Sequence, residues 1–209
     1  MDTTSKNVSY MYKKFPYPFP SSKTKNVNEL LNLGEDVVVF DNGFRQDFTN
    51  LEVIEEKFSL IKGDITKKED IDNMVSTVVE RHGKLNIGVQ ATGWGYLSPF
   101  LENTEEDLVK IMNLQFKGPY QFFQACIPAM SEGGSIIQIS SATATIMLDN
   151  HAAYMGTKAG IDHVVRTIAN EFGEKNIRAN SISPGLTSTP MTAEAMAAPG
   201  LEEAFRKCY

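Results

Sequence analysis

The sequence is poor in cysteine and contains no long apolar run. Its 209 residues include only Cys126 and Cys208, and no cluster of cysteine and histidine surrounds either of them. Neither a disulfide framework nor a metal site is therefore expected. No apolar stretch approaches the roughly 18 residues that a transmembrane helix needs, and the polar start MDTTSKNVSY lacks the zones of a signal peptide. We expect a cytoplasmic protein that makes no contact with a membrane.

An excess of positive charge is also absent, because the formal net charge is -6. Nucleic acids attract basic surfaces, so this balance gives no reason to expect nucleic acid as a partner. Hydrophobic content of 42% and charged content of 22% are ordinary for a globular protein. The length suits one α/β domain, and a small molecule is the expected partner.

Short apolar runs alternate along the chain with segments of helical periodicity. This alternation is typical of repeated βαβ units around a parallel sheet, and it predicts a doubly wound α/β fold. In such a fold, ligands bind outside the carboxyl ends of the strands. The expected strands span residues 35–42, 58–64, 85–93, 134–141 and 177–185.

Helical segments are expected between these strands. Ile71, Met74, Val75 and Val78 repeat at helical spacing, and a similar apolar stripe follows Ile161. Residues 104–130 begin with a capping-box-like pair, Thr104 and Asp107, and contain Gly118 and Pro119 in their middle. We predict two helical stretches joined at Gly118 and Pro119.

The segment HAAYMGTKAG places Tyr154 four positions before Lys158. On a helix this spacing puts both side chains on one face. A nearby ammonium favours the phenolate, so Lys158 is expected to lower the pKa of Tyr154 and to fit it for acid–base chemistry. Ser141 ends the preceding predicted strand, where its hydroxyl could hydrogen-bond a substrate oxygen. These three groups suit carbonyl reduction, for which a nicotinamide cofactor would supply the hydride.

Several motifs in order resemble the short-chain dehydrogenase/reductase (SDR) family, in its single-domain branch. Its serine segment resembles ISSATA at 139–144, its Tyr-x-x-x-Lys motif resembles YMGTK at 154–158, and its Pro-Gly stretch resembles NSISPGLTSTPM at 180–191. The helix that carries the family's catalytic asparagine resembles IMNLQFKG at 111–118. The resemblance implies a Rossmann-like sheet and an oxidoreductase that acts on an alcohol or carbonyl substrate.

The resemblance also implies roles for individual residues. Tyr154 would be the acid–base group, Ser141 would position the substrate oxygen, Lys158 would bond the nicotinamide ribose, and Asn113 would hold a water for proton relay. The implied catalytic set is Asn113, Ser141, Tyr154 and Lys158, and the implied cofactor-binding set is Asp41, Asp64, Gly93, Tyr154, Lys158, Pro184, Gly185 and Thr189.

The cofactor and the assembly follow from the same resemblance. A carboxylate at the end of the strand that contains Asp41 can bond the ribose hydroxyls and would repel a 2′-phosphate, which favours NAD over NADP, although Arg45 is close enough in sequence to blur that preference. The family implies a homo-oligomer. Simpler roles also remain open, because Ser141 could cap a helix, Asn113 could mark a helix kink and Asp41 could be a turn residue.

The start of the chain departs from the family. The first glycine is Gly34, so the glycine-rich turn TGxxxGxG is missing, and the prolines of FPYPFP at 15–20 argue against a central strand there. We therefore expect the first strand of the sheet to be absent. The predicted division is an atypical segment, 1–25, followed by an incomplete nucleotide-binding domain, 26–209, which also stops before the family's last strand.

A second departure is QATG at 90–93, where the family has Asn-Asn-Ala-Gly, so that only Gly93 is kept. These departures leave two alternatives open. The chain could be a non-catalytic or truncated homologue with weak or no cofactor binding. Independently of the domain, FPYPFP could be a proline-rich ligand for a protein partner.

Overall fold

The computed structural model describes residues 8–11, 30–42 and 58–185, and for residues 8–11 the backbone alone. Six parallel strands form one sheet in the order β3-β2-β1-β4-β5-β6. The strands are β1 (Val8–Met11), β2 (Val37–Asp41), β3 (Ser59–Lys62), β4 (Ile87–Gln90), β5 (Gly134–Ile139) and β6 (Ile177–Ile182). This is the doubly wound, Rossmann-like order, so the predicted fold class is confirmed.

The five strands that the apolar runs predict all occur within the expected ranges. The predicted absence of the first strand is wrong, because β1 lies at the centre of the sheet between β2 and β4. The strand lies ahead of the prolines that argued against it, and VSYM contains the β-branched and aromatic residues that strands prefer. The prolines of 15–20 lie outside the described residues, and so does the end of the chain to which the predicted absence of the last strand refers.

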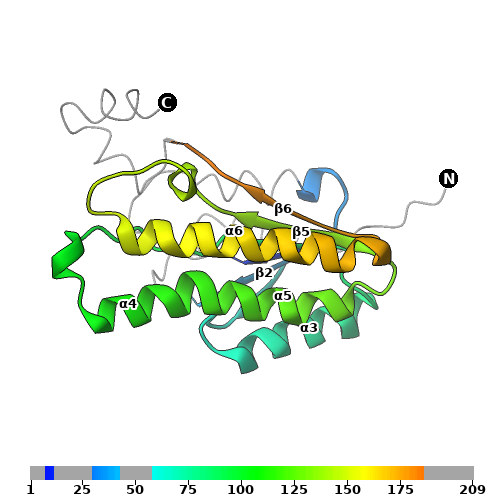
Figure 1. Cartoon of the computed structure of the whole chain (residues 1–209). Helices are drawn as coiled ribbons and strands as arrows, with labels where there is room; N and C mark the ends of the chain where they lie inside the picture. The colour runs from blue at the N-terminus through cyan, green and yellow to red at the C-terminus, as the bar shows by residue number, and fades with distance from the viewer. Residues whose placement is uncertain (1–7, 12–29, 43–57, 186–209) are drawn as a thin grey trace.

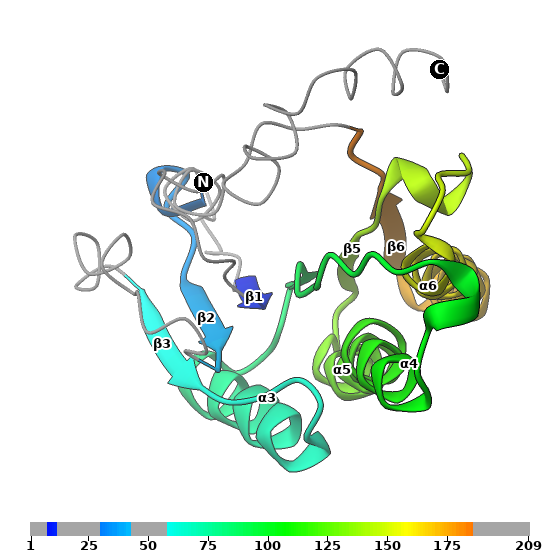
Figure 2. The ribbon, with the colours of Figure 1, turned by 90° about the vertical axis from the view of Figure 1, so that its left-hand side faces the viewer.

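Helices α3 (Lys68–His82), α4 (Glu105–Met112), α5 (Gly118–Ala129) and α6 (Ala152–Phe172) lie on one face of the sheet (Figures 1 and 2). The apolar stripe predicted for α3 is buried, since Ile71, Met74, Val75 and Val78 all belong to the core on this face. The opposite face carries Val37, Val39 and Val89, which pack with Leu30 and Leu31 near the end of a helix described at 30–32.

Shorter helical turns connect these elements. They are η2 (Phe100–Glu102), η3 (Asn113–Lys117), η4 (Ala142–Ala144) and η5 (Gly173–Lys175). Two helical stretches occur as predicted, but the π-helical turn η3 joins α4 to α5 just before Gly118, and the backbone is helical at Gly118 itself. Gly118 is required at this junction, because a Cβ there would lie 2.6 Å from Ile65 Cγ1 and 2.8 Å from the Ile65 carbonyl oxygen.

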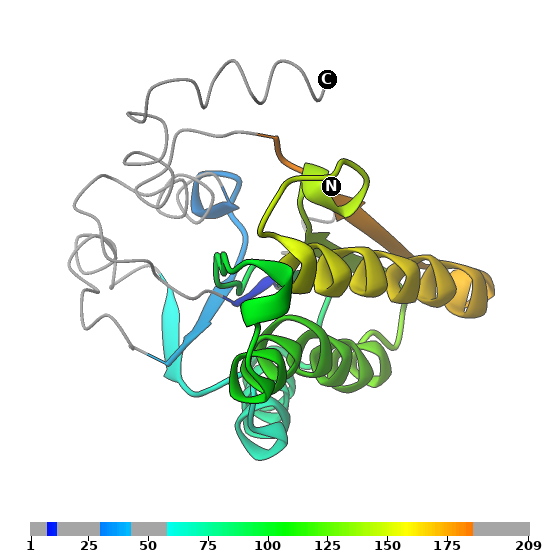
Figure 3. The ribbon, with the colours of Figure 1, turned by 60° about the vertical axis from the view of Figure 1, so that its left-hand side comes forward.

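The carboxyl ends of β1, β2, β4, β5 and β6 meet at one edge of the sheet, and Figure 3 shows the amino-terminal end of α6 beside this edge. The chain runs from β1 through β2 to β3 on one side and then crosses to β4 on the other side of β1. The switch point of the topology therefore lies between β1 and β4, where open α/β sheets bind their ligands.

The central position of β1 can be tested with Ser9→Pro. Proline removes a backbone N–H and distorts the pairing on both sides, so we expect the free energy of unfolding, measured in urea, to fall by about 3 kcal/mol or more. Ser9→Thr keeps the N–H group and is the matched control, for which we expect a much smaller change. Equal stability of the proline variant and the wild type would contradict a central strand at this position.

Candidate active site

Helix α6 places Tyr154 and Lys158 one turn apart, as the sequence predicts. Lys158 Nζ lies 5.8 Å from the centroid of the Tyr154 ring. The lysine is 4% exposed, and its Nζ donates a hydrogen bond to the Ile139 carbonyl oxygen at 2.9 Å. The ammonium is therefore fixed between the helix and the end of β5.

Burial has a direct effect on the proton affinity of Lys158. Removal of the ammonium from water lowers its pKa to about 8, and the negative charge of Asp162 acts in the opposite direction. Lys158 can therefore change charge at mildly alkaline pH, where an exposed lysine would stay fully protonated.

Ser141 follows β5 and lies beside the phenol. Its Oγ accepts a hydrogen bond from the Thr143 amide at 3.2 Å and lies 2.8 Å from Thr143 Oγ1, so Ser141 caps η4. The same side chain hydrogen-bonds Tyr154, which lowers the pKa of the phenol. The capping role and the position next to Tyr154 thus occur together.

The pKa of Tyr154 differs from the expectation. Burial raises it above the ordinary value, and the opposing contribution comes from Ser141 rather than from Lys158. The predicted lowering by Lys158 is absent from this structure, because loss of hydration disfavours the phenolate more strongly than the surrounding groups favour it. Tyr154 is therefore a protonated phenol at neutral pH and can donate a proton.

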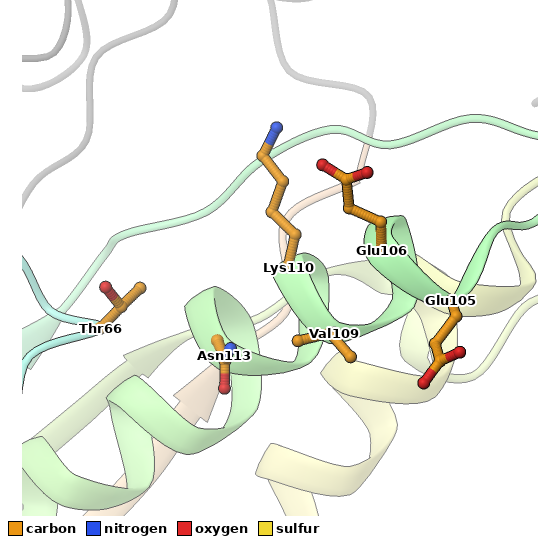
Figure 4. A pocket seen from close by; sticks show the side chains of 6 residues that line it. All are labelled: Thr66, Glu105, Glu106, Val109, Lys110 and Asn113. Carbon is orange, nitrogen blue, oxygen red and sulfur yellow. The ribbon is translucent and has the colours of Figure 1, made fainter.

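Asn113 begins the π-helical turn η3, and its carbonyl oxygen accepts from the Gly118 amide. Its side chain lines a cleft of about 660 Å³ between α4 and the turn after β3 (Figure 4). The other lining residues are Thr66, Glu105, Glu106, Val109 and Lys110. Since Ser141, Tyr154 and Lys158 do not line this cleft, the cleft is separate from the group that they form.

Gln115 is a site residue that the sequence analysis missed. It is 1% exposed; its Oε1 accepts from the Trp94 amide at 3.1 Å, and its Nε2 donates to Thr157 Oγ1 at 3.3 Å. A Cβ on Gly93 would lie 3.0 Å from Gln115 Oε1 and 3.7 Å from Lys158 Nζ. The amide thus joins the segment after β4 to α6, next to the buried lysine.

A sequence signal for Gln115 did exist. The junction predicted at Gly118 and Pro119 indicates irregular helix geometry nearby, and the structure has a π-helical turn immediately before Gly118. Such turns are frequent at functional sites. Such a turn adds a residue to the helical repeat, so regular helical counting from α4 does not indicate which side chain faces the site. A buried amide three residues before Gly118 was the feature to examine.

Two of the predicted cofactor residues lie at the ends of adjacent strands. Asp41 ends β2 and is 7% exposed, and its carbonyl oxygen accepts from the Gly63 amide at 3.0 Å. Asp64 follows β3, and its Oδ1 accepts from both the amide and the hydroxyl of Thr66 at 2.9 Å. Asp64 thus has a local role in shaping the turn before α3.

The remaining predicted residues follow the strands on the other side of β1. Gly93 lies after β4, next to Gln115 and Lys158, and Pro184 follows β6. The Pro184 carbonyl oxygen accepts from the Ala142 amide at 2.9 Å, which joins the Pro-Gly segment to the residue after Ser141. Gly185 is the last residue of this described segment, and Thr189 lies outside the described residues.

These side chains fit a nicotinamide dinucleotide. A buried carboxylate ends β2, a glycine follows β4 where a side chain would approach the buried lysine, and the phenol and ammonium lie on α6. Asp41 and Gly93 follow the strands on either side of β1. This is the place where a doubly wound sheet binds a dinucleotide, and a carboxylate at the end of β2 suits its ribose hydroxyls.

The comparisons with known proteins agree with this geometry. A family model described as enoyl-(acyl carrier protein) reductase matches residues 25–209. The hydroxynaphthalene reductase-like protein Arp2 of Metarhizium acridum is 32% identical over 170 residues, which cover 78% of this chain and 63% of that protein. A 3-oxoacyl-(acyl-carrier-protein) reductase of Thermotoga maritima is 30% identical over 130 residues, 61% of this chain and 53% of that protein.

A solved structure gives the same fold. A short-chain dehydrogenase from Streptomyces avermitilis superposes with a TM-score of 0.79 at 23% identity, covering 90% of this chain and 68% of that one. The chain belongs to the short-chain dehydrogenase/reductase family. Members of this family are oxidoreductases that use NAD or NADP. The chain spans between 49% and 63% of the length of the first curated relatives that it matches.

The described residues contain neither a candidate metal site nor a candidate membrane-spanning helix. Within 8–11, 30–42 and 58–185, no group of three or more His, Cys, Asp or Glu side chains could hold a metal ion. Among the helices in the same ranges, none has the length and apolar character to cross a membrane.

Replacement of the buried lysine should reveal its effect on stability. Below pH 8 the ammonium is charged in both folded and unfolded chains, and a pKa lowered from 10.5 to about 8 then disfavours folding by about 3 kcal/mol relative to neutral lysine. We therefore expect Lys158→Met to raise the free energy of unfolding at pH 7 by about 2 kcal/mol, because methionine keeps the volume without the charge.

The sign of the pH dependence provides the control. Between about pH 8 and pH 10.5 the folded wild type loses the proton that the unfolded chain keeps, so wild-type stability rises relative to that of the variant. Denaturant unfolding of both proteins across this range should show their difference narrowing. If Lys158→Met is less stable than the wild type at pH 7, or if the difference in stability between them does not depend on pH, the lowered pKa of Lys158 is contradicted.

Proposed function

We propose that the protein transfers a hydride between a nicotinamide cofactor and an alcohol or ketone. The observation that carries this proposal is the convergence of three groups at the carboxyl edge of the sheet. The Tyr154 phenol, the Ser141 hydroxyl and the Lys158 ammonium come from α6 and from the end of β5, and the first two are hydrogen-bonded.

In the reducing direction, Tyr154 donates the proton and the substrate oxygen accepts it. The phenol suits this role because burial keeps it protonated. Ser141 donates a hydrogen bond to the same substrate oxygen and so stabilises the negative charge that develops on it. A nicotinamide held by these residues would supply the hydride, or accept it in the opposite direction.

Lys158 supports the phenol by its charge. When Tyr154 gives up its proton, the neighbouring ammonium stabilises the phenolate that forms, so its effect is greatest after proton transfer. We assign to Gln115 the task of holding the Trp94 backbone and Thr157 around this pair. We also propose that Asn113, which begins the π-helical turn, holds a water for proton relay.

We assign the cofactor as NAD. Asp41, Gly93, Pro184, Gly185 and Thr189 would hold it together with Asp64 and the two α6 residues. The buried carboxylate of Asp41 at the end of β2 supports this choice, because it would accept hydrogen bonds from ribose hydroxyls and repel a 2′-phosphate.

We further propose an apolar substrate and an oligomeric enzyme. Leu97 is 63% exposed in the segment after β4, and this segment reaches the start of α6 through the bond from the Ser98 amide to the Asn150 carbonyl oxygen. An exposed apolar side chain in a segment bonded to the start of α6 supports an apolar ketone as the substrate. Exposed Val109 and Met112 on α4 support association with a second copy.

Tyr154→Phe tests the catalytic assignment. Loss of the only transferable proton on this side chain should lower kcat by about 100-fold or more, while thermal stability changes little. The measurement is the absorbance change of reduced cofactor with a panel of cyclic and aromatic ketones. His163→Gln, an exposed change on the same helix, is the control that should keep full turnover. Wild-type turnover by the phenylalanine variant would refute the assignment.

Asp41→Ser tests the cofactor assignment. The wild type should have a higher kcat/KM with NADH than with NADPH, and removal of the carboxylate should reduce this preference by about tenfold. Asp36→Ser removes an exposed carboxylate just before β2 and should leave the ratio unchanged. A wild-type preference for NADPH would contradict the assignment of NAD.

A further inference from the structure

Asp162 lies one turn after Lys158 on α6, and both side chains reach the end of β5. Lys158 Nζ donates to the Ile139 carbonyl oxygen at 2.9 Å, and Ser140 Oγ donates to Asp162 Oδ2 at 2.8 Å. Ser140 is 5% exposed. The lysine and the aspartate thus fix the two residues that immediately precede Ser141.

The second carboxylate oxygen of Asp162 is also buried. Asp162 Oδ1 accepts no hydrogen bond from the described residues. Inside a protein such an oxygen retains its negative charge only where a positive charge compensates for the lost hydration. The ammonium of Lys158 is one helical turn away, and the charge of Asp162 raises the pKa that burial lowers.

The elements packed nearest to this pair offer little competing charge. Strand β5, η4 and α5 contain no Asp, Glu, Lys or Arg, and the titratable groups on α5 are Tyr120 and the buried thiol of Cys126. On β6, Arg178 is exposed and alternates with Ile177 and Ala179, which face the core beneath α6.

The charged groups of the remaining neighbours lie elsewhere. Lys110 of α4 is 4.6 Å from the centre of the Trp94 ring, and Lys117 of η3 is exposed. The other charged or basic residues on these elements and on α6 itself are exposed or face solvent. They are Glu105, Glu106, Asp107, His163, Arg166, Glu171, Glu174 and Lys175. The charge that opposes the effect of burial on the pKa of Lys158 is that of Asp162.

We propose that Asp162 is a positioning residue that keeps Lys158 in its ammonium form and holds the end of β5 in place for Ser141. This inference rests on the proposed function, because the lysine charge matters for turnover only if Tyr154 passes through a phenolate. Asp162 itself acts through Lys158 and Ser140, without contact with the reacting atoms.

The test is a pH titration of Asp162→Asn by two methods. The first follows the NMR signal of ¹³C-labelled lysine Cε, assigned by its loss in Lys158→Met, and requires no turnover. The second is the pH profile of kcat with NADH and a ketone that the wild type reduces. We expect the Lys158 transition and the alkaline limb of kcat both to move to lower pH by about one unit.

Two variants separate charge from packing. Ser140→Ala removes the hydrogen-bond donor but keeps the carboxylate, so it should lower the melting temperature while leaving the Lys158 transition in place. Asp162→Glu restores the charge and should recover most of the wild-type pH profile. If Asp162→Asn does not fold, Asp162→Ser serves for the same titration.

The outcomes are distinguishable. An unchanged Lys158 transition in folded Asp162→Asn would overturn the inference, as would an equal shift in Ser140→Ala. A shifted NMR transition in a protein that lacks turnover with every substrate would support the electrostatic coupling and refute the proposed function. A shifted NMR transition with an unmoved alkaline limb of kcat would overturn the link between Asp162 and catalysis.

Discussion

The hydrogen bond from Lys158 Nζ to the Ile139 carbonyl oxygen joins the helix that carries the phenol to the strand that leads to Ser141. Together with the bond from Ser140 Oγ to Asp162 Oδ2, it limits the small displacements of α6 against β5 that apolar packing tolerates and catalysis does not. The Gln138 side chain donates to the same carbonyl oxygen at 2.7 Å. One backbone acceptor thus fixes both the strand end and the ammonium, and the alignment of phenol and hydroxyl depends on it.

This arrangement explains why a buried charge persists in the core. The ammonium lies between apolar layers, where replacement by a hydrocarbon side chain would relieve the cost of desolvation. Its retention is consistent with a site in which stability and activity make opposing demands. The hydroxyl of Ser141 has two roles, since it caps η4 and also hydrogen-bonds the phenol.

Much of the fold could be predicted because its signals are local. Buried parallel strands are short apolar runs, and residues 37–41 or 134–139 show this without ambiguity. The pairing of Tyr154 with Lys158 follows from helical spacing alone. The central strand was missed because four residues with no glycine turn after them carry little signal, and the nearby prolines suggested a different structure. The parallel pairing of β1 with β2 and β4 depends on the whole sheet, so the four residues of β1 do not reveal it.

The electrostatic details of the site were beyond local reasoning for a related reason. The pKa of Tyr154 depends on how completely other elements exclude water, which spacing on one helix does not reveal. Gln115 reaches the site only because a π-helical turn changes the direction of its side chain. Asp41 and Ser141 were accessible to prediction because the end of a strand fixes a position in space independently of such details.

The place of β1 in the sheet also has a consequence for biosynthesis. The strand is synthesised before the other five strands of the sheet, yet one of its two partners, β4, follows only after β2, β3 and α3. The pairing of Val8 with Ile87 closes a long stretch of chain, so the sheet cannot be completed from contacts between neighbours in sequence. Until β4 is made, one edge of β1 remains unpaired, and the nascent chain exposes a surface to which other strands, or a chaperone, can bind.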